Sequence, residues 1–182
     1  MSTESAPAAA PAHPRRLAVT LVVAAILLVV DQLSKWWAES ELTGAAPIPV
    51  IGEFIRFRLL YNPGAAFSLG ADATWVFAIL SGVAVIALVW VSLRVRHTGW
   101  ALALGLLLGG AATHLGDRLF REPGFARGHV VDFIDYNGWF VGNIADIALF
   151  LGAVTLLLLS FLGIGLDGTR ESDKEAEEAP SE

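Results

Sequence analysis

Two aspartates in this chain stand beside strongly apolar segments, where a carboxylate is energetically costly. Asp132 lies between Val131 and Phe133, and Asp146 follows Asn143 by three residues at the start of a long apolar run. On membrane-insertion scales an Asp costs about 2.5–3.5 kcal/mol at the bilayer centre and less near the interface. Such positions indicate a polar site close to the membrane surface. Spacing alone does not show that the two carboxylates meet.

Two carboxylates that share a site provide acid–base chemistry. They do not both ionise easily, so one keeps a proton while the other acts as a base. Such a pair could activate water and protonate the leaving amine of a peptide bond, with no metal or covalent intermediate. Helix capping is the alternative for Asp146, because Asn143 is placed as an N-cap and Asp146 as the N3 residue. Asp135, closer to Asn137 and Gly138, is expected to be a solvated acid.

Further polar residues fall at helix ends on the same side of the chain. Asp31 and Lys35 are four residues apart and predict an ion pair on one helical face, either structural or substrate-binding. Asp117 and Arg118 are adjacent, so they diverge and each needs its own partner. Arg118 could hold backbone or a loop carboxylate. The polar groups expected on this side are Asp31, Lys35, Asn62, His114, Asp117, Arg118, Asp132, Asn143 and Asp146.

Two other classes of function compete with a carboxylate pair. The spacings His114-x-x-Asp117 and His129-x-x-Asp132 offer nitrogen and oxygen ligands for a divalent metal, and hence a metal-dependent membrane hydrolase. A small ion- or proton-coupled transporter is the second alternative. It requires ionisable groups along a path across the whole membrane, whereas here they gather on one side.

The composition is that of an integral membrane protein. The chain has 182 residues, is 55% hydrophobic and has a mean hydropathy of +0.61, with the apolar residues clustered in long runs. The formal net charge is −6, but the acidic residues concentrate after Asp167. No basic patch indicates a nucleic-acid partner. The absence of cysteine excludes disulfides, thiolate metal sites and a Cys nucleophile.

The hydrophobic pattern predicts an all-α membrane protein with four transmembrane helices and a small β-rich extracytoplasmic element between the first two. Each apolar run is long enough to cross a hydrocarbon core of about 30 Å. Gly105 and Gly109 predict a close approach of the third helix to a neighbour. The expected helices are at about 17–37, 73–93, 100–120 and 144–162, in a single membrane domain of residues 15–165, with disordered tails at 1–14 and 166–182.

Two connecting segments, residues 38–72 and 121–139, should lie together on the side opposite both termini. In the first, Phe54–Tyr61 alternates apolar and basic residues, which predicts a strand. Asn62-Pro63-Gly64 then predicts a turn. The second segment, rich in glycine, is expected to be a loop.

The distribution of basic residues does not by itself orient the helices by the positive-inside rule. The side with the termini carries Arg15, Arg16, Arg94, Arg96, Arg170 and Lys174. The opposite side carries Lys35, Arg56, Arg58, Arg118, Arg121 and Arg127. If Lys35 and Arg118 are site residues rather than loop charges, the balance favours termini inside.

Five motifs in this order resemble those of lipoprotein signal peptidase (signal peptidase II), a family of bacterial membrane aspartic peptidases. The likeness runs from about Leu17 to Leu162. The motifs are Asp31-Gln32-Leu33-Ser34-Lys35, Asn62-Pro63-Gly64-Ala65-Ala66-Phe67-Ser68, Gly109-Gly110-Ala111 before Asp117-Arg118, Val130-Val131-Asp132-Phe133, and Asn143-Ile144-Ala145-Asp146.

The resemblance implies that Asp132 and Asp146 are the catalytic pair, without metal or cofactor. It implies a prolipoprotein substrate, cleaved before a cysteine that already carries diacylglyceryl. It also implies a location among the lipids of the bacterial cell membrane, with both termini cytoplasmic and the site near the outer leaflet. We expect the protein to be a monomer. The residues expected to bind substrate or support the pair are Asp31, Lys35, Asn62, Gly64, His114, Asp117, Arg118, Asn143 and Ala145.

Two positions depart from the family pattern. Thr113-His114 stand where Gly-Asn is usual. Histidine can donate and accept a hydrogen bond as asparagine does, but it can also become charged, which predicts a pH sensitivity. Gly142 stands where the family has phenylalanine, which should loosen the packing beside Asp146 without touching a polar role.

Overall fold

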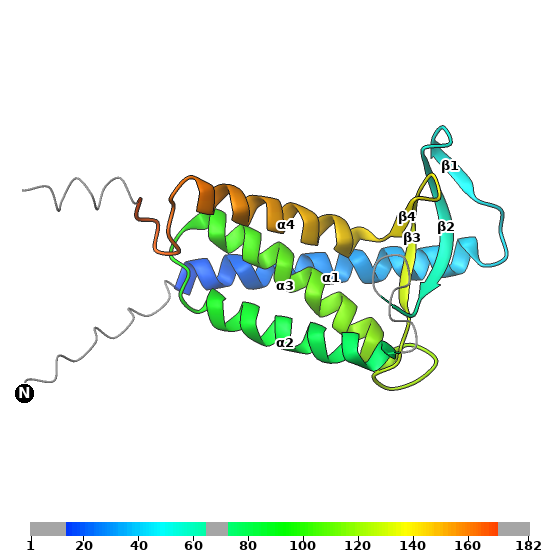
Figure 1. The fold of residues 1–182 in the computed structure, drawn as a ribbon, viewed down its shortest axis with the longest axis horizontal. Coiled ribbons are helices and arrows are strands. Elements are labelled where there is room, and N and C mark those ends of the chain that lie inside the picture. Colours follow the sequence, from blue (N-terminus) through cyan, green and yellow to red (C-terminus); the bar gives the residue numbers. More distant parts are fainter. Residues whose placement is uncertain (1–13, 65–72, 171–182) are drawn as a thin grey trace, which may run out of the picture.

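Four long helices form the body of the protein, whose computed structural model describes residues 14–64 and 73–170 (Figure 1). They are α1 (Pro14–Leu42), α2 (Thr74–Ser92), α3 (Thr98–Phe120) and α4 (Ile144–Phe161). Each is long and apolar enough to cross a membrane. Large apolar side chains such as Ile86 and Phe150 are exposed on the bundle, as expected where lipid rather than water is the solvent. The predicted four-span fold is confirmed.

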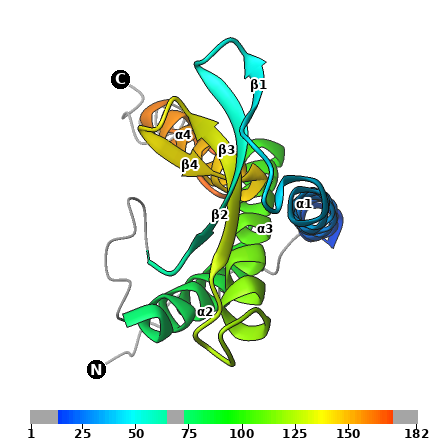
Figure 2. The same ribbon diagram turned by 90° about the vertical axis from the view of Figure 1, so that its right-hand side faces the viewer.

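Helix α3 lies at the centre of the bundle and contacts the other three helices (Figure 2). Its glycines allow the close approach. A Cβ added to Gly109 would lie 3.0 Å from the carbonyl oxygen of Ala24 on α1. A Cβ on Gly110 would lie 3.1 Å from the carbonyl oxygen of Ala145 on α4. Gly105 packs in the same way against α1, so the predicted close approach of the third helix is confirmed.

A four-stranded antiparallel sheet covers one end of the bundle (Figure 1). Its order is β1 (Ile48–Ile51), β2 (Ile55–Asn62), β3 (Val130–Tyr136) and β4 (Phe140–Gly142). The strand predicted around 54–61 is present as β2. Segment 121–139 was wrongly expected to be a loop, since it contains β3. Five of the seven β3 residues are fully buried, so the strand lacks the alternation that marks a half-buried one.

Helix α1 continues past Trp37, where it was wrongly expected to end, and carries the sheet. Its 29 residues span about 43 Å at 1.5 Å per residue, which exceeds a hydrocarbon core of about 30 Å. In the added turns, Ala38 and Leu42 form a buried cluster with Phe133 of β3. The ring of Trp37 meets that of Phe57 edge-on, with centroids 5.2 Å apart. The sheet is therefore fixed to α1 by apolar packing.

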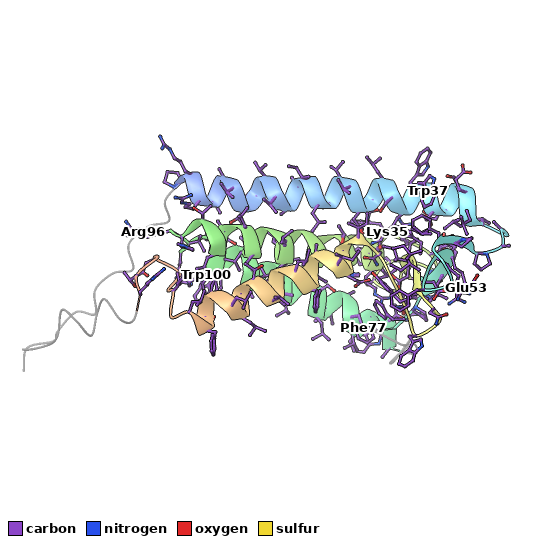
Figure 3. All side chains as sticks on the ribbon, turned by 90° about the horizontal axis from the view of Figure 1, so that it is seen from above. Lys35, Trp37, Glu53, Phe77, Arg96 and Trp100 are labelled. Atoms are coloured by element: carbon purple, nitrogen blue, oxygen red, sulfur yellow. The ribbon has the colours of Figure 1, made fainter. Side chains whose placement is uncertain are left out.

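The other end of the bundle is closed by the chain that follows α4. The indole Nε1 of Trp100 donates to the carbonyl of Ile164 at 2.9 Å. The backbone N–H groups of Arg96 and His97 donate to the carbonyl of Leu166. Residues 166–170 are thus ordered structure, contrary to the expected start of the tail; residues 1–13 and 171–182 lie outside the described part. Arg96 and Trp100 mark this end in Figure 3, and Lys35 and Glu53 lie toward the sheet.

Candidate active site

Asp132 and Asp146 line one cavity at the sheet end of the bundle. Asp132 lies in the middle of β3, and Asp146 lies in the first turn of α4. The cavity has a volume of about 220 Å³. It is lined by Asn62, Gly64, Phe77, Ser81, His114, Arg118, Val130, Asp132, Phe140 and Asp146. The tertiary structure thus brings the two carboxylates to the same cavity, which their spacing in the sequence could not show.

Two asparagine amides hold the carboxylate of Asp132. Asn62 Nδ2 donates to Oδ2 at 2.9 Å, and Asn143 Nδ2 donates to Oδ1 at 2.7 Å. Each amide has its orientation fixed by a backbone N–H that donates to its oxygen, from Gly64 at 3.0 Å and from Asp146 at 3.1 Å. Neither amide can flip without losing that bond, so both NH₂ groups point at Asp132.

The pKa of Asp132 is raised to about 6, first because the carboxyl is buried. The nearby charge of Asp146 raises the pKa further, while the two amide hydrogen bonds and His114 oppose the rise. The side chain is only 2% exposed. Asp132 is therefore a carboxyl that can keep or release a proton close to neutral pH, which is the range that acid–base catalysis requires.

Asp146 caps its own helix and also faces the cavity. Its Oδ2 accepts from the backbone N–H of Asn143 at 2.9 Å, and the Asn143 side chain accepts from the Asp146 N–H, so the predicted N-cap is confirmed as a full capping box. Its Oδ1 lies 3.2 Å from Nε2 of His114 on α3. Capping and a place in the site are thus compatible, and the helix N-terminus stabilises the negative charge.

Arg118 binds four backbone carbonyls, and its hydrogen-bond partners within residues 14–64 and 73–170 include no carboxylate. Its Nη1 donates to the carbonyls of Asn62 at 2.9 Å, Pro63 at 3.0 Å and Gly128 at 3.0 Å, and its Nη2 donates to that of Gly64. The side chain is 3% exposed. Of the two partners expected for Arg118, the structure therefore shows the backbone. The guanidinium joins the turn after β2 to the residue that leads into β3, and so holds together the two segments that carry Asn62 and Asp132.

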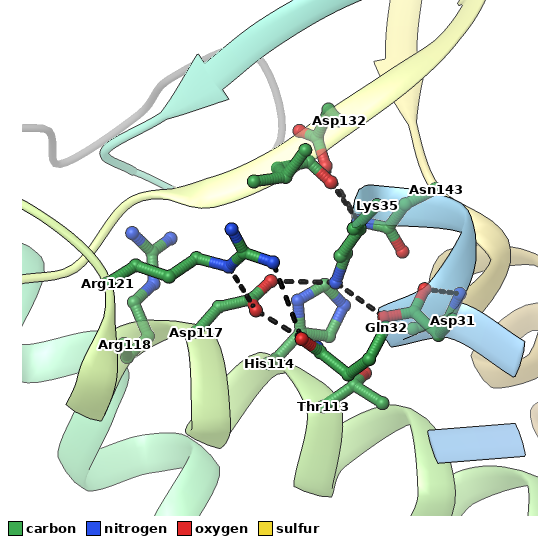
Figure 4. Close-up of polar contacts among 12 residues, drawn as sticks. Asp31, Gln32, Lys35, Thr113, His114, Asp117, Arg118, Arg121, Asp132 and Asn143 are labelled. Atoms are coloured by element: carbon green, nitrogen blue, oxygen red, sulfur yellow. Dashed lines mark hydrogen bonds and ion pairs between the residues drawn. The ribbon is translucent and has the colours of Figure 1, made fainter. Parts of the chain in front are cut away.

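A buried ionic network lies beneath the cavity (Figure 4). Lys35 Nζ lies 2.6 Å from Asp31 Oδ2 and 2.7 Å from Asp117 Oδ2, and all three side chains are at most 1% exposed. Asp117 Oδ1 accepts from Arg121 Nε at 2.7 Å and from Gln32 Nε2 at 3.0 Å. The predicted pair of Asp31 and Lys35 is present, but it belongs to a larger network in which Lys35 and Arg121 pair with Asp31, Asp117 and, at its more exposed edge, Glu39.

The network reaches the start of α4 through one hydrogen bond. Asp31 Oδ1 accepts from the backbone N–H of Ala145 at 2.9 Å. This N–H is one of the first four of the helix, which have no partner within it. Asp31 on α1 therefore caps α4 from outside and fixes the turn that carries Asp146. The role of Ala145 is a backbone one, because its side chain is fully buried and apolar.

Asp135 is buried, contrary to the expectation of a solvated acid. It has no exposed surface and lies 2.9 Å from Arg56 Nη2 and 3.2 Å from Arg58 Nε. Burial would raise the pKa of this carboxyl, but the Gly138 N–H, at 2.6 Å, and the two arginines hold it below its usual value. Asp135 thus fastens β3 to β2, on which Arg56 is its direct cross-strand partner.

Sequence reasoning missed four residues of the cavity wall, Phe77, Ser81, Val130 and Phe140. An apolar or small residue on a helix carries no chemical signal, and β4 was not predicted at all. His129 does not line the cavity. Within residues 14–64 and 73–170, no three His, Cys, Asp or Glu side chains are grouped to hold a metal, so the geometry does not support the metal-site alternative.

The fold and the site define a multi-pass membrane protein in which two carboxylates, one buried and one partly exposed, line one cavity, the arrangement of an aspartic peptidase. The family model described as signal peptidase (SPase) II matches residues 23–162. The chain is 41% identical over 175 residues to a lipoprotein signal peptidase of Leifsonia xyli, covering 95% of this chain and 81% of that protein. It is 42% identical over 178 residues to one of Mycobacterium tuberculosis, covering 94% and 88%. The chain belongs to the signal peptidase II family.

Two solved structures share the fold. One, described as a bacterial membrane enzyme, has a TM-score of 0.71 at 23% identity and covers 91% of this chain and 94% of its own. The other, with the same description, has a TM-score of 0.68 at 26% identity and covers 79% and 92%. The arrangement of four helices and a sheet is therefore one that bacterial membrane enzymes adopt.

Proposed function

We propose that this membrane peptidase removes the signal peptide from prolipoproteins by using Asp132 and Asp146 to activate water. The observation that carries the proposal is that both carboxylates line one cavity at the end of a membrane-spanning bundle. The substrate is a prolipoprotein anchored by diacylglyceryl on the cysteine after the scissile bond. Its lipid holds the cysteine at the membrane while the peptide bond enters the cavity, which accounts for a polar site at this depth.

The proposed reaction uses one protonated and one ionised aspartate. Asp146, stabilised as an anion by the N-terminus of α4, accepts a proton from water, and the water oxygen bonds to the scissile carbonyl carbon. Asp132, which burial favours in its protonated form, donates its proton to the carbonyl oxygen.

Collapse of the resulting diol completes the reaction. A proton passes from Asp146 to the amide nitrogen, the C–N bond breaks, and Asp132 regains a proton from a diol hydroxyl. The products are a carboxyl at the end of the signal peptide and a free amine on the lipidated cysteine. The pair returns to its starting protonation state.

The remaining polar residues serve this reaction by position. Asn62 and Asn143 aim Asp132, and Arg118 holds the Asn62–Gly64 turn against the start of β3. Asp31 and Lys35 set the start of α4 through the Ala145 N–H. We propose that these are supporting residues, since their polar atoms are already bonded within the protein.

Burial of two cations supports an orientation with both termini in the cytoplasm and the site near the outer leaflet. Lys35 and Arg118 are 0% and 3% exposed, so they are not loop charges available to the membrane surface. Discounting them leaves six basic residues on the side of the termini and four on the opposite side. We further propose that the enzyme acts as a monomer, because the cavity is built within a single chain.

A cleavage assay with Asp132→Asn and Asp146→Asn tests the proposal. Purified enzyme and a diacylglyceryl prolipoprotein are combined, and the release of signal peptide is followed by mass spectrometry. Each variant should lose cleavage by at least about a thousandfold, because removing one member of a catalytic unit removes most of its effect. Glu53→Gln is the control, since Glu53 is an acid at the same end whose side chain is 82% exposed. Near-normal turnover in either aspartate variant contradicts the assignment.

A further inference from the structure

Phe140 lies where three cavities meet. Besides the catalytic cavity, it lines an apolar cavity of about 580 Å³ against α4. It also lines a third cavity of about 310 Å³ on the side of the sheet that includes Arg58 and Trp139. Three parts of the proposed substrate also meet at one residue: the signal peptide, the mature chain and the lipid are all joined at the lipidated cysteine.

The apolar cavity suits a hydrocarbon chain rather than a peptide. Its walls are Tyr136, Phe140, Asn143, Asp146, Ile147 and Phe150. The polar side chains of Asn143 and Asp146 already bond to each other's backbone in the capping box, which leaves few partners for a peptide backbone that must satisfy its own N–H and C=O groups. Its volume lies within the roughly 300–1,000 Å³ of ordinary ligand sites.

This cavity adjoins both the catalytic cavity and the exposed apolar face of α4. Asp146 and Phe140 line it as well as the catalytic cavity. At its outer edge Ile147 is 41% and Phe150 is 68% exposed, and Leu157 and Leu158 continue the exposed apolar face of α4. An acyl chain in this cavity would therefore lie beside Asp146 at one end and at the lipid-facing side of α4 at the other.

The ring of Phe140 is the wall between these two cavities, and Gly142 gives it room. A Cβ on residue 142 would lie 2.6 Å from Phe140 Cε1 and 2.8 Å from Asp146 Oδ2. The ring stacks on Tyr136 at a centroid distance of 5.9 Å. The space beside Asp146 is thus filled by an aromatic ring two residues earlier in the chain, and the packing there is not loosened by Gly142.

We propose that the cavity between β4 and α4 receives an acyl chain of the substrate's diacylglyceryl group, with Phe140 separating that chain from the peptide. The inference rests on the proposed function. It makes Ile147 and Phe150 specificity-determining residues, although neither reaches the reacting atoms.

The test compares two lipopeptides that differ only in acyl length. One carries palmitoyl and the other acetyl groups on the glyceryl thioether, and kcat/KM is measured for each in detergent micelles. Ile147→Trp fills the cavity, so it should lower kcat/KM for the palmitoyl substrate by about tenfold or more, a loss of the size that a few methylenes make in an apolar pocket. The acetyl substrate should be cleaved at the wild-type rate. Leu157→Trp, on the same helix face but outside the cavity, should change neither.

Two further variants distinguish a loss of acyl-chain binding from a folding defect. Phe150→Ala removes lining at an exposed position and should raise KM for the palmitoyl substrate alone. Phe140→Ala should lower the ratio of palmitoyl to acetyl kcat/KM by merging the cavities. Parallel loss with both substrates in Ile147→Trp and Phe150→Ala, or no change in either, overturns the inference. Failure of the wild-type enzyme to cleave either lipopeptide overturns the proposed function instead.

Discussion

At the scale of single residues, the decisive feature is that Asp132 is oriented by groups that are themselves fixed. The amides of Asn62 and Asn143 each accept a backbone N–H and donate to Asp132. A carboxyl so held has one open direction on each oxygen, and Asp146 and the cavity lie nearby. Preorganisation of this kind keeps a catalytic group from reorienting during the reaction.

The raised pKa of Asp132 makes the stability of the protein depend on pH. The folded carboxyl titrates near pH 6, above its unfolded value, so it stabilises the fold fully at low pH and loses that contribution as the pH rises through 6. The loss amounts to at most about 3 kcal/mol at 1.36 kcal/mol per pKa unit. The unfolding free energy of Asp132→Asn minus that of the wild type should therefore increase from pH 4.5 to pH 7. Chemical denaturation in detergent measures this difference. A difference that is constant with pH, as expected for Glu53→Gln, contradicts the prediction.

Replacing His114 should change the pH dependence of the activity. Its Nε2 is 3.2 Å from Asp146 Oδ1, and among the described residues Asp132 and Arg118 are the other charged groups that line the same cavity. A histidine ordinarily titrates between pH 5 and 8, whereas asparagine does not. The pH profile of kcat/KM should therefore lose one limb in His114→Asn and keep it in His129→Asn, because His129 lies outside the cavity. An unchanged profile for His114→Asn rules the idea out.

At the scale of elements, α3 positions the site through close helix packing. It packs on α1 through two of its own glycines, and on α4 through one glycine from each helix. Gly105 and Gly109 face α1, while Gly110 faces α4, where Gly152 faces back. These contacts set how far the first turn of α4 stands from α3, and so the distance between Asp146 and His114.

Gly110→Ala should destabilise the bundle, whereas Gly116→Ala should not. The added Cβ at residue 110 would lie 2.6 Å from Leu149 Cγ, but at residue 116 it meets nothing within 4 Å. Overpacking of this kind costs about 1–3 kcal/mol, while an alanine in an open helical position gains up to about 1 kcal/mol over glycine. Thermal unfolding in detergent measures both. Equal unfolding temperatures for the two variants would mean that the α3–α4 contact is not tight.

At the scale of the whole molecule, the ionic network of Lys35 unites the elements that carry the site. It joins α1 to α3 by ion pairs and α1 to α4 by the bond from Ala145 to Asp31. The sheet is attached separately, through Arg118 and the packing of Phe133 on α1. Asp132 and Asp146 thus reach the cavity on two different supports, and both supports depend on α1 and α3.

Removing the central cation should be strongly destabilising. Lys35→Met leaves Asp31 and Asp117 with one neutralising partner fewer at full burial, and breaking a buried pair in this way costs about 3–5 kcal/mol. Arg127→Met removes an exposed cation on the same side and should cost less than about 0.5 kcal/mol. The unfolding free energies of the two variants and the wild type, measured in detergent, test this difference. A mild effect for Lys35→Met, with cleavage intact, would show that the network does not hold the site.

The sequence by itself determined the four spans, the strand β2 and the cap at Asn143. These follow from local rules, since hydropathy over about 20 residues, alternation and capping are properties of short segments. Only the tertiary structure decided that Asp135 is paired with arginines, that β3 and β4 complete the sheet, and that Phe140 lies over Gly142. Each of these depends on residues distant in sequence, and a buried strand or an aromatic wall carries no periodic or chemical signal of its own. For the same reason, spacing named Asp132 and Asp146 as candidates, but only the packing of α4 against α3 and of β3 against α1 put them in one cavity.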